Sequence, residues 1–408
     1  MKFAYFVVPH IGGTYTVFKQ LRKGLVDYGI DVRWLGFGGK DPTKSPEWKS
    51  EAGIGTMVET PETLDECEQA RCLAAAVLEG GFDGVFVNVL ANRTQMNIAR
   101  YLPKHILRIM IVHNITPGTY EAAGAIRDHV HATIGVSERC RTDLVERYRF
   151  DEDRTFVIPN AIDITPYKGM RPASRGEGDN LKTLFLGRIE DSSKGVFWLP
   201  TILDNSPSSV RMTIAGNGPD LEQLRNRMSR HSERVTFLGA VSPDRVPDLL
   251  HSHDALVMPS RFEGYPLTLI EAMAAGCVPI VSHIRGVTDT IVKNGSNGFL
   301  FPVGDCQAAG RLVARLQGDR AEFASASGAA RQIAEQSFTV EGMASRYYNV
   351  ISRMRVKRPV LAPALDLDDW ALPRGLRPGL RTYLPKPVKN WLRVVRERYR
   401  YTPFGATR

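Results

Sequence analysis

The sequence predicts an α/β protein with two doubly wound domains in succession. Two stretches of alternating strand and helix signals carry this prediction, because a Pro- and Gly-rich charged segment separates them. The length of 408 residues also exceeds what one ordinary core would fill. The domains are expected at residues 1–165 and 181–339, with a linker at 166–180.

In the first domain, short apolar runs alternate with helical patterns. The run KFAYFVVP predicts a first strand, Gly12 and Gly13 a turn, residues 17–28 a helix, and Gly29 the end of that helix. Because the strands are almost continuously apolar, we expect a parallel sheet that is buried on both faces. Further strands are expected at residues 30–37, 84–89, 108–114, 132–137 and 155–160.

The second domain repeats the alternation of strands and helices. A last helix at residues 340–355 is expected to pack back on the first domain. Sheets of this kind bind ligands at the carboxyl ends of their strands, so the two domains are expected to face each other across a cleft. The strands of this domain are expected at residues 182–188, 211–218, 235–241, 255–260 and 278–282.

Composition excludes several classes of protein. No run approaches the about 18 consecutive apolar residues of a transmembrane helix, and the N-terminus lacks the features of a signal peptide. The cysteines are odd in number and form no C-x-x-C pair, so neither a disulfide framework nor structural zinc is expected. A reducing cytoplasm is therefore the expected location. The cysteines are Cys67, Cys72, Cys140, Cys277 and Cys306.

Two cations follow the first strand of the second domain. In FLGRIEDSSKG, Arg188 and Lys194 lie just beyond the strand end. Two such charges can neutralise a diphosphate without a metal ion. The alternative interpretation is that both are solvated surface residues.

Glycines mark two other strand ends. Gly216 and Gly218, in AGNGPD, would let the backbone approach a ligand closely, although many ordinary turns share this pattern. Gly12 and Gly13 follow the first strand in the same way. His113 ends another strand, where a purely structural role is the alternative.

Two glutamates lie eight positions apart in PSRFEGYPLTLIEAMAAGCVPIV, at Glu263 and Glu271. Pro266 is well placed to begin a helix, so Glu263 is expected on a loop and Glu271 just over one turn into the helix. The backbone N–H groups of Gly264 to Leu267, including Tyr265, form a candidate anion site. A carboxylate beside small apolar residues needs hydroxyl donors, and sugar hydroxyls supply them.

Together these features resemble the retaining, nucleotide-sugar-dependent glycosyltransferases of the GT-B fold, the bacterial group 1 family with glycogen-synthase-like relatives. The resemblance spans residues 1–354 and is most specific in the E-x7-E pattern. The other matching motifs are Arg188 with Lys194, AGNGP, VIPNAID and the N-terminal P-x-x-G-G. Tyr265 departs from the usual pattern, in which Phe is frequent, and leaves the sugar and acceptor open.

The resemblance implies a role for each motif residue. Arg188 and Lys194 would bind the donor diphosphate and stabilise charge on the departing nucleotide, Glu271 would hold the ribose, and Glu263 would lie near the transferred sugar. His113 would lie against the donor sugar, and no metal or other cofactor is expected. The remaining implied donor-binding positions are Gly12, Gly13, Gly216, Gly218, Gly264, Tyr265, Pro266 and Leu267.

The resemblance therefore implies a two-domain Rossmann-like GT-B enzyme that moves a sugar from a UDP- or GDP-linked donor to a glycan, lipid-linked or other acceptor. A nucleotide-sugar epimerase of the same architecture and a non-catalytic nucleotide-sugar-binding protein are the alternatives. A dinucleotide oxidoreductase is disfavoured, because no G-x-G-x-x-G follows the first strand.

The basic charge of the chain is concentrated in its tail, residues 356–408. This segment holds twelve Lys/Arg against four Asp/Glu, a net charge of +8, which leaves +1 for residues 1–355. An amphipathic helix is expected at 386–401, with Val388, Trp391 and Leu392 on its apolar face. It could bind an anionic membrane or pack on the protein itself; nucleic acid is not an expected partner, because no nucleic-acid motif accompanies the charge.

Overall fold

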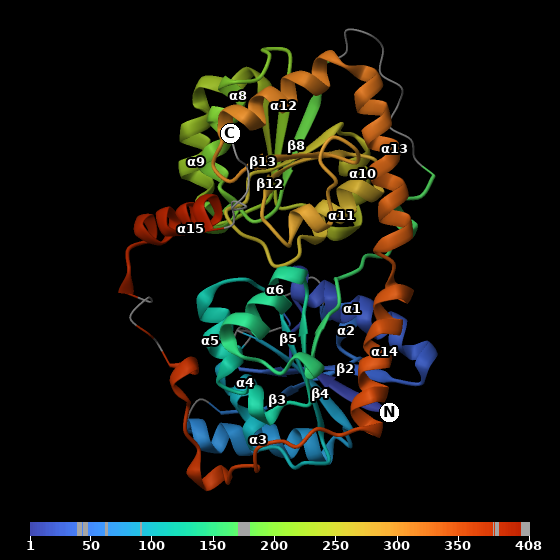
Figure 1. Ribbon diagram of the computed structural model, residues 1–408, viewed down its shortest axis with the longest axis vertical. Helices are drawn as coiled ribbons and strands as arrows, with labels where there is room; N and C mark the ends of the chain where they lie inside the picture. Colours follow the sequence, from blue (N-terminus) through green and yellow to red (C-terminus); the bar gives the residue numbers. More distant parts are fainter. Residues whose placement is uncertain are drawn as a thin grey trace. The chain divides into compact units, whose positions relative to one another are not determined.

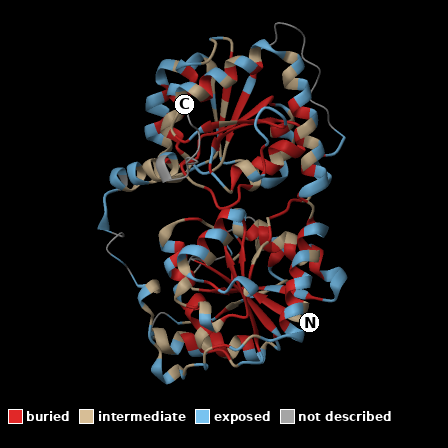
Figure 2. Cartoon of the chain, in the orientation of Figure 1, coloured by how far each residue is buried: buried red, intermediate tan, exposed pale blue. Residues whose placement is uncertain are grey.

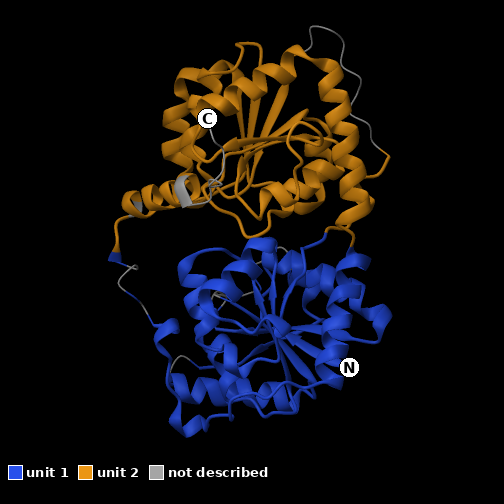
Figure 3. Cartoon of the chain, viewed as in Figure 1, with its two compact units in different colours: residues 1–161, 340–383 blue, residues 162–339, 384–408 orange. Residues whose placement is uncertain are grey.

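The computed structural model describes residues 1–38, 43, 48–61, 64–89, 92–169, 180–377, 379 and 383–400. The chain forms two compact units (Figure 3). Unit 1 consists of Met1–Ala161 and Val340–Tyr383, and unit 2 of Ile162–Thr339 and Leu384–Arg408. Most of the predicted linker, residues 170–179, lies outside the described residues.

Unit 1 is built on a seven-stranded sheet in the order β3-β2-β1-β4-β5-β6-β7 (Figure 1). Every pairing in it is parallel, as the apolar runs predicted. The edge strand β3 was not predicted, because only the last of its three residues is buried and it forms no continuous apolar run. The strands are β1 (Lys2–Tyr5), β2 (Asp31–Phe37), β3 (Thr56–Val58), β4 (Gly84–Asn88), β5 (Leu107–Val112), β6 (Ala132–Gly135) and β7 (Thr155–Val157).

Helices cover the sheet of unit 1, and its central strands are buried (Figure 2). α1 begins at Gly13, four residues before the expected start, so Gly13 lies in the first helical turn and not in a preceding turn. Gly29 ends this segment in a left-handed conformation, as predicted. The last helix, α14, packs against α1. The α-helices of unit 1 are α1 (Gly13–Leu25), α2 (Trp48–Glu51), α3 (Glu66–Glu79), α4 (Arg93–Asn97), α5 (Pro117–Gly124), α6 (Glu138–Thr142) and α14 (Val340–Val356).

Unit 2 is built on a six-stranded parallel sheet in the order β10-β9-β8-β11-β12-β13. Strand β13 was not predicted. The strands are β8 (Lys182–Leu186), β9 (Arg211–Ala215), β10 (Val235–Gly239), β11 (Ala255–Met258), β12 (Val278–His283) and β13 (Phe299–Pro302). Its α-helices are α7 (Asp191–Lys194), α8 (Leu199–Asp204), α9 (Leu221–Met228), α10 (Val246–His251), α11 (Leu267–Ala274), α12 (Cys306–Gly318), α13 (Arg320–Ser337) and α15 (Lys386–Arg400).

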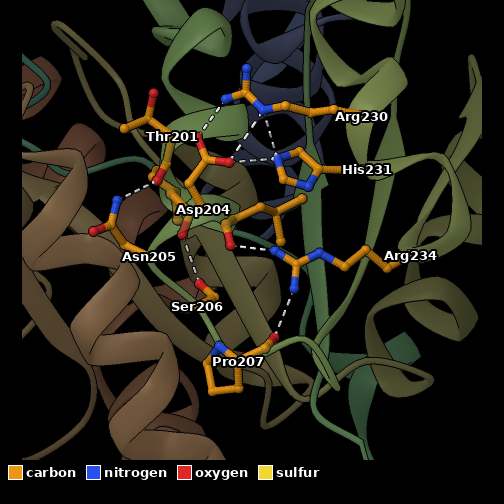
Figure 4. Close-up of polar contacts among 10 residues, drawn as sticks. Thr201, Asp204, Asn205, Ser206, Pro207, Arg230, His231 and Arg234 are labelled. Atoms are coloured by element: carbon orange, nitrogen blue, oxygen red, sulfur yellow. Dashed lines mark hydrogen bonds and ion pairs between the residues drawn. The ribbon is translucent and has the colours of Figure 1, made fainter.

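Polar side chains connect the end of α8 to the segment before β10 (Figure 4). Asp204 accepts hydrogen bonds from Arg230 and pairs with His231 at 3.0 Å. Arg234 donates to the carbonyl of Pro207 at 2.8 Å and to that of Leu203. These side chains donate to carbonyls that also accept from the Ser206 and Val210 amides, so the segment after α8 is held to the segment before β10.

The tail runs over both units in turn. Its Pro-rich part lies on unit 1, where the amide of Ala362 donates to Asp128 and that of Leu365 to Arg100, each at 2.9 Å. This part of the tail therefore lies against the surface of unit 1. No helix among the described residues is long and apolar enough to cross a membrane.

The predicted amphipathic helix is present as α15, and it belongs to unit 2. It contacts unit 2 through arginines, because Arg393 and Arg398 donate to backbone carbonyls there. Three of its apolar positions are exposed, Val388 by 41%, Trp391 by 63% and Leu392 by 46%, whereas Val394 and Val395 are half-buried. The helix thus contacts unit 2 through arginines, whereas hydrophobic packing would have buried Val388, Trp391 and Leu392.

Candidate active site

Three loops of unit 2 meet where their strands end. β8 lies between β9 and β11 in the sheet, and all three run parallel, so their carboxyl ends share one edge. The loop after β8 carries Arg188 and Lys194, the loop after β9 carries Gly216 and Gly218, and the loop after β11 carries Glu263. Such an edge is where doubly wound sheets bind ligands.

The glycines of the second loop make room for the first loop. A Cβ atom on Gly216 would lie 1.8 Å from the carbonyl oxygen of Gly187, and one on Gly218 would lie 2.2 Å from that of Ile189. Gly216 also has a φ of 142°, which disfavours any side chain. The amide of Ile189 donates to Asn217 at 2.9 Å across the same contact. These glycines therefore allow two protein loops to approach each other closely. This contact accounts for both glycines without the close approach of a ligand that the sequence suggested.

Lys194 and Glu263 form an ion pair that joins the first loop to the third. The Lys194 ammonium lies 2.6 Å from Glu263 Oε1, and the Ser260 hydroxyl donates to the same oxygen at 2.6 Å. Glu263 is buried, whereas Lys194 keeps part of its side chain exposed. A carboxylate with two donors on one oxygen is held in place, which suits a positioning role better than that of a free nucleophile.

A buried ion pair behind this contact was missed by sequence reasoning. Arg261 donates to the carbonyl of Asp191 at 2.7 Å and to its carboxylate at 2.8 Å. Its guanidinium also lies 3.8 Å from the centre of the Trp198 ring, a cation–π contact. The available signal was a basic residue two positions before Glu263. Its partner lies 70 positions away, so the sequence could not identify it.

The turn that carries Lys194 requires glycine at its end. Gly195 closes α7 with a φ of 61°, the left-handed conformation. A Cβ there would lie 2.1 Å from the carbonyl oxygen of Pro259. The α7 turn and the loop after β11 are therefore in backbone contact.

Arg188 lies at the same edge but is exposed. Within the described part of the chain, its guanidinium has no hydrogen-bond or ion-pair partner. An exposed, unpaired guanidinium next to a paired ammonium leaves positive charge available for an anion.

Glu271 lies in α11, which begins at Leu267 with Pro266 as its N-cap, close to the predicted start. Burial raises the pKa of the Glu271 carboxyl to about 7. Burial raises the pKa of Tyr167, and the charge of Glu271 raises it further. Tyr265, on the preceding loop, is buried with its ring edge-on to Phe338. The two glutamates thus lie on a loop and in a helix, as predicted.

Gly12, Gly13 and His113 belong to unit 1. His113 Nε2 lies 2.8 Å from Asn88 Oδ1, and the Asn88 amide donates to the Phe6 carbonyl at 2.9 Å. Because this leaves the amide oxygen as an acceptor, Nε2 carries the imidazole proton. Burial lowers the pKa of His113 to about 4, so the ring is neutral at pH 7. Asn88 was also missed, although a polar residue ending an apolar strand was a visible signal.

No three His, Cys, Asp or Glu side chains within the described ranges are grouped as metal ligands.

Two family descriptions match the sequence of this chain. Residues 180–319 match "Glycosyl transferases group 1", and residues 11–165 match "Glycosyltransferase Family 4". Both halves of the chain therefore carry glycosyltransferase domains, and the domain at residues 180–319 is of group 1. Gly12, Gly13 and His113 lie in the first matched segment along the chain, and Arg188, Lys194, Glu263 and Glu271 lie in the second.

Curated relatives of this glycosyltransferase include the glycogen synthase of Mycobacterium tuberculosis, 26% identical over 65% of this chain and 67% of the relative. The phosphatidyl-myo-inositol mannosyltransferase of the same organism is 29% identical over 46% of this chain and 53% of the relative. The chain thus matches about half to two thirds of the length of these relatives.

The structure of Anabaena Alr3699/HepE in complex with UDP and glucose is similar to the glycosyltransferase in fold. Its TM-score is 0.73 at 18% sequence identity, covering 86% of this chain and 99% of the other. The predicted GT-B fold is therefore confirmed, and the roles of individual residues stay predictions.

Replacing Glu271 with Gln is expected to stabilise the fold at alkaline pH. The pKa of Glu271 is raised from 4.5 to about 7 in the folded chain, so its contribution to stability is present below pH 4.5 and lost as the pH rises through 7. Glu271→Gln should raise the free energy of unfolding by about 2–3 kcal/mol at pH 8 and leave it nearly unchanged at pH 4. Urea unfolding at the two pH values measures the difference, and an equal effect at both would contradict it.

Proposed function

We propose that this glycosyltransferase moves a sugar from a UDP- or GDP-linked donor to an acceptor hydroxyl with retention of anomeric configuration. The acceptor belongs to a polysaccharide, glycolipid or other glycoconjugate. The observation that carries the proposal is the Lys194–Glu263 pair at 2.6 Å. It joins the E-x7-E motif to the motif of Arg188 and Lys194 at the edge of the sheet where such folds bind ligands.

The cations act on the leaving group. When the bond between the anomeric carbon and the phosphate oxygen breaks, negative charge grows on the diphosphate and positive charge on the sugar ring. Lys194 and Arg188 stabilise the diphosphate, and preorganised charge of this kind is usually the largest single catalytic contribution. No metal ion is then needed for this step.

The glutamates hold the donor and do not carry protons. Glu263 already accepts from Lys194 and Ser260, and its carboxylate accepts from hydroxyls of the transferred sugar as well. Glu271 accepts from the ribose hydroxyls, which favours its ionised form and offsets the effect of burial. The N–H groups from Gly264 to Leu267 bind phosphate or sugar oxygens.

The proposed roles of the unit 1 residues stay predictions. Gly12 is the N-cap of α1, and its amide region offers donors for an anion. A neutral His113 can hydrogen-bond to a sugar hydroxyl without placing a positive charge beside a developing cation. These properties suit the diphosphate and donor-sugar roles that the resemblance implies.

The relatives support the reaction class. The two named above are a glycogen synthase and a mannosyltransferase, and the HepE structure contains UDP and glucose. UDP-sugars are therefore the first donors to test, followed by GDP-mannose.

A donor panel without acceptor is expected to show slow release of the nucleoside diphosphate from one nucleotide sugar. The rate should be unchanged by EDTA, because Arg188 and Lys194 supply the positive charge that a metal would bring. Nucleotide release followed by chromatography measures it. Conversion of the donor to an epimer, with the nucleotide still attached, would identify an epimerase, and binding without any turnover would identify a non-catalytic protein.

Lys194→Ala is expected to lower turnover by about 100-fold or more, since one electrostatic donor to a developing charge contributes this much. Glu271→Ala should also abolish most turnover by weakening the grip on the ribose. The matched control is Lys182→Ala, which removes an exposed lysine at the other end of strand β8. Wild-type rates in both site variants, with unchanged melting temperatures, would refute the site assignment.

We also propose that the enzyme works as a peripheral protein on the cytoplasmic face of a membrane with anionic lipids. The outward strip of α15 (Val388, Trp391 and Leu392) is exposed on a tail with a net charge of +8. Apolar insertion and basic charge act together in such helices, with about 1 kcal/mol for each Lys or Arg near the surface. This location suits a lipid-linked acceptor.

Vesicle flotation tests the membrane proposal. The wild type should float with vesicles that contain phosphatidylserine and stay behind with phosphatidylcholine alone, and the bound fraction should fall several-fold in Trp391→Ser/Leu392→Ser. Val360→Ser, which changes an apolar residue of the tail that is 95% exposed on unit 1, is the control. Equal flotation of all three proteins would contradict a role for the strip.

A further inference from the structure

The tail helix α15 contacts the loop that carries Lys194. Arg393 donates through Nη1 to the carbonyl of Ser192 at 2.6 Å. Its guanidinium carbon lies 4.4 Å from the centre of the Phe262 ring. Ser192 is two residues before Lys194 and Phe262 is one residue before Glu263. Arg393 therefore touches both segments that the Lys194–Glu263 pair joins.

The α7 turn depends on donors from outside for its shape. A helix of four residues leaves most of its carbonyls without helical partners. The carbonyl of Asp191 accepts from the Arg261 side chain at 2.7 Å, and that of Ser193 accepts from the Arg261 amide at 2.8 Å. Arg393 fills the position between them, at Ser192. The Asp191 carbonyl also accepts from the Gly195 amide at 3.1 Å, whereas the carbonyls of Ser192 and Ser193 accept from Arg393 and Arg261, which come from distant parts of the chain.

The contact requires an arginine in particular. A planar guanidinium can lie over an aromatic ring and donate at its edge at the same time, which an ammonium on a flexible stem cannot do. Burial lowers the pKa of Arg393, and the charge of Glu190 raises it in return. The side chain stays charged at neutral pH and can serve as a strong donor.

We propose that Arg393 is a positioning residue for Lys194 and Glu263, so that the C-terminal helix α15 is a working part of the donor site. The inference deepens the proposed function and rests on it. Arg393 holds the α7 carbonyl and the Phe262 ring, and these fix where the ammonium and the carboxylate meet. The tail thereby acts on the chemistry at Lys194 without contacting the donor.

Arg393→Ala should lower kcat for donor cleavage by about 10-fold and change KM by less than about 3-fold. The reason is that a misplaced Lys194 loses stabilisation of charge that develops in the transition state, more than it loses ground-state binding. Arg393→Lys should recover only part of the rate, since it keeps the charge but loses the stack. Arg374→Ala, an exposed arginine of the tail on unit 1, is the control for charge removal and should behave as the wild type.

A double-mutant cycle separates positioning from general destabilisation. If Arg393 acts through Lys194, Arg393→Ala should cost less than about 2-fold in a Lys194→Ala background, because the group that it positions is gone. Equal losses in both backgrounds would overturn the proposal, as would wild-type kcat in Arg393→Ala. If Arg393→Ala fails to fold, the cycle is run with Arg393→Lys, whose full activity would also overturn it. Absence of nucleotide release by the wild type would instead refute the proposed function, so the two failures are distinguishable.

Discussion

The ion pair between Arg261 and Asp191 is the interaction on which the candidate site depends. Its side chains are only 10% and 11% exposed, and a buried charge is tolerated only when its partner is well placed. The pair joins the loop after β8 to the loop after β11, and the stack of Arg261 on Trp198 fixes it from a second side. Lys194 and Glu263 then meet at the surface of this support. Lys194 and Glu263, which are proposed to take part in the reaction, are therefore held in place by Arg261 and Asp191, for which no part in the reaction is proposed.

Neighbouring residues of one motif make different contacts around the candidate site. Within PSRFEGYP, Ser260 donates to Glu263, Arg261 supports the opposite loop, and Phe262 receives Arg393. Three successive side chains therefore serve three different partners. Ser260 holds the carboxylate directly, whereas Arg261 and Phe262 act on its position through the neighbouring backbone.

Much of the fold could be predicted because its strands are buried on both faces and are read as continuous apolar runs. β3 was not predicted because only its last residue is buried and it forms no continuous apolar run. β13, which is as long as the predicted strand β1, was also not predicted, and α1 begins at Gly13 although glycine is a weak start signal. The motif residues of the candidate site were predicted from the sequence, but the residues that hold them in place were not. Arg261 and Arg393 act through partners that are distant along the chain, and sequence alone does not say which face of α15 meets the protein.

The division of the tail between the units has a consequence for engineering. The chain passes from unit 1 to unit 2 after Ala161, returns after Thr339, and enters unit 2 again after Tyr383. A chimaera that exchanges the donor domain with a relative therefore needs three junctions. A swap made with the first two alone would join a foreign α7 turn to a resident α15, and the new turn would have to match an arginine selected for another partner.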